Sequence, residues 1–184
     1  MLIASVWRGW ARGTFIAGLL LGGLLATSIA VAVGSLVLRS WIPEGTTRRA
    51  VVGVVVVIAW ARDAGVVRFK IPQNARQVPE AIALQGQRLG AFQFGVEMGT
   101  GMRTFMTSML PHVVVAAALL LCSWPEGAFM GICFGFGRAI VPLARTFADN
   151  EDRWSDAFSK RERTIQVSLG LAVAVGGLLA GAFF

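Results

Sequence analysis

Long uncharged runs alternate with short charged segments along the chain, and this alternation predicts membrane-spanning helices. A helix needs about 20 apolar residues to cross a bilayer. The segments 14–38 and 164–184 contain no Asp, Glu, Lys or Arg. We therefore predict an all-α, polytopic membrane helix bundle that forms a single transmembrane domain, residues 1–184. Its predicted spans are residues 14–38, 50–67, 91–122, 128–147 and 164–184.

The number of spans depends on residues 50–67. Arg62 and Asp63 follow the apolar run 50–61, which is too short to cross a bilayer comfortably. The segment crosses if the Arg62 side chain reaches the interface or pairs with Asp63. The bundle then has about five spans, and it has four if residues 50–67 are re-entrant.

The 91–122 segment is too long for one ordinary span and combines two kinds of sequence. Residues 113–122 are apolar, whereas the first part carries Glu97, Arg103 and several glycines, and Pro111 follows. Interrupted helices are tolerated at membrane depth where they face protein or a water-filled cavity. This pattern predicts a kinked or broken helix.

Basic residues set the predicted orientation. The segments 62–88 and 145–163 are rich in Arg and Lys, whereas the turn Ser123–Gly127 has neither. Under the positive-inside rule the two basic segments are cytoplasmic. With four spans the N-terminus lies outside, and with five spans it is cytoplasmic. Three arginines would then lie outside, against the rule: Arg39, Arg48 and Arg49.

Composition supports a membrane protein and argues against several other classes. Hydrophobic residues make up 55% of the 184 residues and charged residues 15%, against about 25% charged in soluble domains. The net charge of +7 is spread between the apolar runs. It predicts topology signals and anionic-lipid contacts, not nucleic-acid binding. Abundant Arg, Ala, Gly and Val are typical of a high-GC genome, so we expect a bacterial inner membrane. The first apolar run is long and no small-residue cleavage site follows it, so we expect no cleaved signal peptide.

Two stretches of the chain share a spacing that predicts an internal repeat of two hairpins. Both 18–27 and 95–104 have the pattern G-x-x-x-G-x-x-x-x-T. A second shared pattern, Ser-Trp followed by Pro-Glu-Gly, occurs at 40–45 and at 123–127. Sites in repeat-built transport proteins lie between the copies, but glycine-rich apolar text also matches by chance.

Polar residues in the first part of the 91–122 segment follow helical spacing and predict a polar stripe. Charged side chains inside a bilayer are tolerated where they are paired or have a function. We expect Glu97 to pair with Arg138. Arg103 then remains for an anionic ligand, a lipid headgroup or a partner subunit. The stripe fits a substrate or proton path, and it equally fits a seam between packed helices. The candidate ligand- or ion-path residues are Gln93, Glu97, Thr100, Arg103, Thr104, Thr107, His112 and Arg138.

The glycine-rich text G-x-x-x-G-T-G-x-x-T at 95–104 and F-G-F-G-R-A-I-V-P at 134–142 resembles the second half of the cytochrome c biogenesis/thiol-reductase transmembrane family. The resemblance implies a membrane fold and electron transfer through cysteines that stand beside prolines. Neither Cys122 nor Cys133 stands beside a proline. No catalytic cysteine is therefore carried over from this family.

These patterns lead to three functional hypotheses. The first is a multi-pass protein without enzymatic chemistry, cofactor or metal, which is transporter-like or is a membrane subunit of a larger complex. The second is a transmembrane thiol or electron-transfer protein. The third is a structural or assembly subunit that docks other membrane helices. The expected partners are the lipid bilayer and either another membrane protein or a second copy of this chain.

Overall fold

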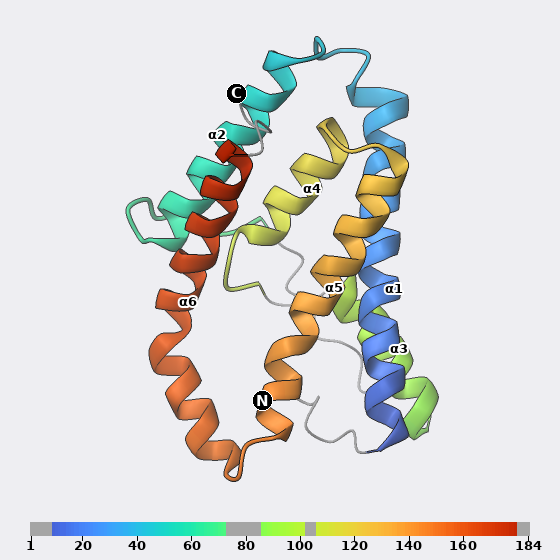
Figure 1. The fold of residues 1–184 in the computed structure, drawn as a ribbon, viewed down its shortest axis with the longest axis vertical. Helices are drawn as coiled ribbons and strands as arrows, with labels where there is room; N and C mark the ends of the chain where they lie inside the picture. Colours follow the sequence, from blue (N-terminus) through green and yellow to red (C-terminus); the bar gives the residue numbers. More distant parts are fainter. Residues whose placement is uncertain (1–8, 73–85, 102–105, 180–184) are drawn as a thin grey trace. The chain divides into compact units, whose positions relative to one another are not determined.

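The computed structural model describes residues 9–72, 86–101 and 106–179. Over these ranges the chain is all-α, with six α-helices, one short π-helix and no strand (Figure 1). The predicted helical class is therefore confirmed. The elements in chain order are α1 (Trp10–Val33), the π-helix η2 (Gly34–Leu38), α2 (Thr46–Asp63), α3 (Gln87–Gly99), α4 (Leu110–Leu120), α5 (Trp124–Thr146) and α6 (Glu151–Leu179).

The described residues form two compact units; the single transmembrane domain stays a prediction. Unit 1 contains α1 up to Ala26, α3, and α5 from Ala128 onward, together with α6 up to Phe158. Unit 2 contains the end of α1 from Thr27, η2, α2 and α4, together with α6 from Ser159. Three helices, α1, α5 and α6, therefore contribute residues to both units.

Two described helices are long and apolar enough to cross a membrane: Trp10–Leu38, which is α1 with η2, and Trp124–Thr146, which is α5. The other predicted spans are shorter or more charged. In α2 the charged residues at both ends leave a short apolar middle. In α6 the apolar part begins only after Arg163, and residues 180–184 lie outside the described residues. The 91–122 segment contains most of α3 and all of α4, helices of 13 and 11 residues, or about 20 and 17 Å at 1.5 Å per residue.

In unit 1, the backbones of α1 and α3 approach closely at their glycines (Figure 1, blue and green). A Cβ added at Gly18 would collide with the Phe92 carbonyl oxygen, and one added at Gly95 would collide with that of Phe15. Gly22 and Gly99 face each other in the same way. The contact is reciprocal, because the two G-x-x-x-G segments compared above meet each other. Small residues allow this close approach between membrane helices; whether the segments are true repeats stays a prediction.

A second glycine contact joins α5 to a neighbouring face of α1. A Cβ at Gly23 would lie 3.1 Å from the Gly135 nitrogen and against the Gly131 carbonyl oxygen. A Cβ at Gly135 would lie 2.9 Å from the Leu19 carbonyl carbon. Helix α1 thus packs closely on two helices at once, and apolar side chains fill the remaining space of unit 1. Its buried residues are Ala11, Phe15, Leu19, Ala91 and Ala139.

Unit 2 has an apolar core between α2 and α4. Valines on one face of α2 pack against the apolar face of α4, and Gly34 of η2 lets the Leu119 backbone approach closely. Also on α2, Trp60 packs against Gly170 of α6. The buried members of this core are Val52, Val56, Ala59, Ile71, Met109, Val113 and Leu120.

Two helices begin earlier than the hydrophobic pattern predicts. The Ser123–Gly127 segment, which we read as a turn, contains the first residues of α5, and Glu126 accepts hydrogen bonds from the Ser123 N–H at 2.8 Å and hydroxyl at 2.7 Å. The charged segment that we predicted as a loop, 145–163, contains the start of α6 after Asn150, whose Oδ1 accepts the Arg153 N–H at 2.8 Å. Side-chain caps of these kinds favour helix starts.

Two neighbouring glycines of α5 test the packing of α5 on α1. We expect Gly135→Ala to lower the stability of the protein by about 1–3 kcal/mol, because the new methyl group meets the Leu19 backbone. Gly137→Ala is the control: nothing lies within 4 Å of a Cβ there, and Ala favours a helix over Gly by about 1 kcal/mol. The melting temperature in detergent checks both variants. Equal melting temperatures for the two would contradict this packing.

Candidate functional site

The predicted site residues do not share one helix face. Gln93 and Glu97 lie on α3, Thr100 follows it, and Arg138 lies on α5, all in unit 1. Thr107 and His112 lie in unit 2, and Arg103 and Thr104 lie outside the described residues. The stripe required continuous helical spacing, whereas α3 ends at Gly99 and α4 begins at Leu110.

In unit 1, the end of α3 lies near a positive charge. Gly101 has a φ of +68°, in the left-handed region that terminates helices and favours glycine. A Cβ there would lie 3.9 Å from an Arg138 guanidinium nitrogen, and the same guanidinium stands 5.7 Å from the centre of the Phe134 ring. A cation is favourable at a helix C-terminus and over an aromatic face. The Glu97–Arg138 pair stays a prediction.

In unit 2, the N-terminus of α4 is built around the buried carboxylate of Asp63, the last residue of α2. The Asp63 side chain is 2% exposed. It accepts hydrogen bonds from the Met109 N–H at 3.0 and 3.2 Å and from the Ser108 hydroxyl at 2.6 Å. It also pairs with the Arg62 guanidinium at 3.1 Å. The predicted pairing of Arg62 with Asp63 is therefore present. The same Asp63 carboxylate caps the N-terminus of α4.

Thr107 accepts hydrogen bonds from further polar side chains at the same end of α4. Its carbonyl oxygen accepts a hydrogen bond from Arg62 at 2.7 Å, and its hydroxyl accepts one from Gln166 of α6 at 2.9 Å. Gln166 also donates to Glu162 at 3.1 Å. Thr107 is nevertheless exposed. We name Arg62, Asp63, Thr107, Ser108 and Gln166 the α4 entry cluster.

The other end of α4 is capped by an arginine. The Arg39 guanidinium, just after η2, donates to the carbonyl oxygens of Leu119 at 2.9 Å, Ala118 at 3.0 Å and Cys122 at 2.6 Å. The last carbonyls of a helix have no partner within it. Arg39 supplies those partners.

Both ends of α4 thus meet the charge that suits the helix dipole, a carboxylate at the N-terminus and a guanidinium at the C-terminus. Sequence reasoning did not assign either residue to this role. A signal existed for one of them: Asp63 closes an apolar helix, where a lone acid is costly and needs a partner. The partner itself was not visible, because Met109 lies 46 positions further on.

His112 has a structural contact rather than an open position. Its Nε2 lies 2.7 Å from the Pro72 carbonyl oxygen. Nε2 therefore carries the proton and donates it, while Nδ1 is buried without a hydrogen-bond partner in the described structure. This single histidine holds the segment after α2 against the first turn of α4.

Both cysteines are free thiols, Cys122 half-buried and Cys133 exposed. The described residues also contain no cluster of His, Cys, Asp and Glu able to hold a metal ion.

Comparisons with protein-family models, with curated proteins and with solved structures gave no match. The similarity to the cytochrome c biogenesis/thiol-reductase family therefore stays an expectation from the residues that carry it.

The structural role of Asp63 can be tested by its removal. We expect Asp63→Ala to destabilise the protein by about 3–5 kcal/mol, because Arg62 loses its buried partner and the Met109 N–H loses its acceptor. Thermal unfolding in detergent, followed by helical circular dichroism, measures the effect. Asp156→Ala, which removes an exposed carboxylate from α6, should change stability by less than about 0.5 kcal/mol. Similar effects of the two variants would refute the capping role.

Proposed function

We propose that this chain is a multi-pass protein of a bacterial inner membrane and that it is transporter-like, with the α4 entry cluster as its working part. The observation that carries the proposal is this polar cluster, which is built on the buried Asp63 carboxylate, is exposed at Thr107, and lies at the start of a helix too short to span a bilayer. Half-length helices whose N-termini meet polar groups are a feature of transporter sites.

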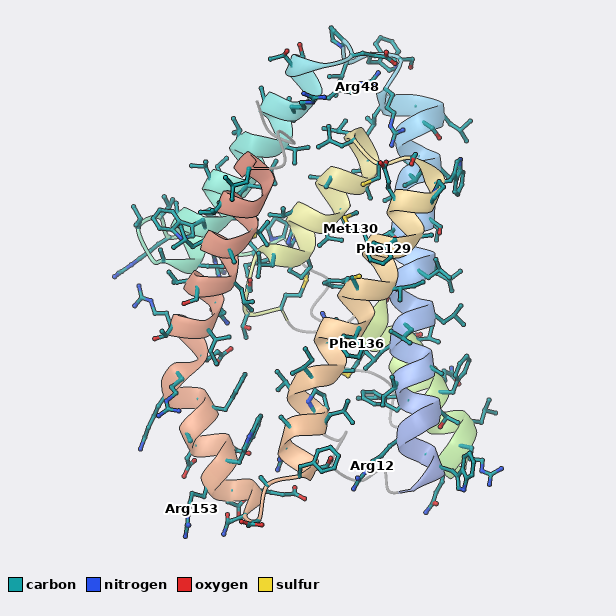
Figure 2. All side chains as sticks on the ribbon, viewed as in Figure 1. Arg12, Arg48, Phe129, Met130, Phe136 and Arg153 are labelled. Atoms are coloured by element: carbon teal, nitrogen blue, oxygen red, sulfur yellow. The ribbon has the colours of Figure 1, made fainter. Side chains whose placement is uncertain are left out.

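Exposed apolar faces support the membrane placement. Soluble monomers rarely expose contiguous apolar patches larger than a few hundred Å². Here helix faces carry large apolar side chains outward; on α5, Phe129 and Phe136 are 69% and 57% exposed (Figure 2). The spacing of three or four residues makes each set a continuous stripe. These stripes contain Leu21, Leu25, Ile29 and Val33 on α1, and Phe129, Ile132, Phe136 and Ile140 on α5.

The charges described inside the helical units support the same placement. Arg39, Arg62 and Asp63 all bind backbone groups or each other. Charge is tolerated inside a membrane protein when it is satisfied in this way.

Orientation follows from the basic segments, with 62–88 and 145–163 on the cytoplasmic side. The arginines on the opposite side were exceptions to the positive-inside rule, and two of them have structural partners that account for their position. Arg39 caps α4. Arg48 donates to the carbonyl oxygens of Ile42 at 3.1 Å and Arg39 at 2.5 Å, which closes the turn before α2 (Figure 2).

Water access at the α4 entry cluster distinguishes a transporter-like protein from a packing subunit. In a Cys122→Ala/Cys133→Ala background, we expect Thr107→Cys to react with a membrane-impermeant thiol reagent in membrane vesicles, because Thr107 is exposed beside Arg62 and Gln166. Mass spectrometry measures the labelled fraction from each side of the membrane.

The matched control is Val115→Cys on α4, where an exposed apolar side chain (41%) should face lipid and stay unlabelled. If Thr107→Cys were as unreactive as Val115→Cys from both sides, the cluster would be a dry helix seam. That result would reject the transport proposal and favour the structural or assembly subunit.

A further inference from the structure

The short segment 66–70 that follows α2 is held firmly at its start. The N–H groups of Val66 and Val67 both donate to the Ala61 carbonyl oxygen, at 2.8 and 3.3 Å. Arg163 of α6 donates to the Ala64 carbonyl oxygen at 2.6 Å. The segment therefore leaves α2 in a defined direction and alongside α6.

The same segment is held at its end. Ile71 is 6% exposed and belongs to the apolar core of unit 2. The next carbonyl oxygen, that of Pro72, lies 2.7 Å from His112 Nε2 on α4. Residues 66–70 thus form a loop that is anchored on α2, α4 and α6. Because the loop is already held in place, a ligand that binds to it does not have to order it first.

This anchored loop exposes apolar and basic side chains together. Val66 is 74% exposed, Val67 46% and Phe69 39%. Arg68 and Lys70 stand between and after them and are also exposed. An apolar side chain held outward next to a cation suits the boundary between lipid headgroups and acyl chains.

Helix α6 adds positive charge beside the anchored loop. Lys160 and Arg161 are exposed and lie three and two residues before Arg163, which bonds to the Ala64 carbonyl oxygen just before the loop. The uncharged part of α6 begins after Arg163, so these cations stand close to where that helix would enter a bilayer. The neighbouring acid, Glu162, is partly buried and accepts a hydrogen bond from Gln166.

We propose that Arg68, Lys70, Lys160 and Arg161 form a binding surface for anionic phospholipid headgroups, with Val66, Val67 and Phe69 inserted at the acyl-chain boundary. The proposal rests on the membrane placement proposed above. Charge complementarity selects the lipid, because four exposed cations at the entry point of a helix attract phosphates of an anionic leaflet. The exposed apolar side chains favour a lipid over a small soluble anion.

Native mass spectrometry of the full-length protein released from detergent micelles tests the surface, with dioleoyl phosphatidylglycerol and dioleoyl phosphatidylcholine as probes. Wild type should bind phosphatidylglycerol at least tenfold more tightly than phosphatidylcholine. Arg68→Gln/Lys70→Gln should weaken phosphatidylglycerol binding by roughly thirtyfold, because each of the two cations contributes about 1 kcal/mol of attraction to an anionic surface. Its phosphatidylcholine binding should stay unchanged.

The control variant is Arg49→Gln/Arg153→Gln, which removes two exposed cations from elsewhere on the chain and should retain the preference. An equal loss in both double variants would show a general charge effect and overturn the proposal. Displacement of phosphatidylglycerol by inorganic phosphate alone would also overturn it, because the surface would then be a small-anion site. Recovery of wild type from the soluble fraction without detergent is a separate result, and it would refute the membrane placement itself.

Discussion

The need to give partners to backbone groups at the ends of α4 organises unit 2. Four N–H groups and four carbonyls at the ends of any helix lack partners within it, and away from water each unsatisfied group is costly. Asp63 accepts a hydrogen bond from the backbone at the N-terminus of α4, and Arg39 donates hydrogen bonds to the carbonyls at its C-terminus. Both belong to the hairpin formed by η2 and α2, so this hairpin and α4 are joined at two points in addition to their apolar core.

Unit 1 is held by a different interaction, the close approach of backbones at glycines. The contacts of Gly18 with Gly95 and of Gly23 with Gly135 need no large side chain at the interface. Large apolar residues are then left on the outer faces of α1 and α5. In a bilayer, leaving these side chains on the outer faces costs little free energy, because lipid is as apolar as the side chains it contacts. Packing rather than hydrophobic burial drives helix association there.

Sequence periodicity and charge predicted the helical class and a kinked or broken helix in the 91–122 segment, because uncharged runs and glycines are local signals; of the kink and the break, the structure has the break. They did not predict the capping of α4, since Asp63 and Met109 meet only after the chain has folded. The early start of α5 was readable in principle, because Ser123 and Glu126 have capping-box spacing. The predicted polar stripe required one continuous helix. The helix ends at Gly99, and Gly101 follows in a left-handed conformation.

Hydrogen exchange of the α4 backbone amides tests the account most directly, with the full-length protein in lipid nanodiscs. If Arg39 and Asp63 together keep α4 formed, an Arg39→Ala/Asp63→Ala variant should exchange the amides of residues 109–121 at least tenfold faster than wild type. The amides of α1 between residues 15 and 26, in the other unit, should keep their wild-type rates. Unchanged protection of α4 in this variant would contradict the claim that its charged caps hold it in place.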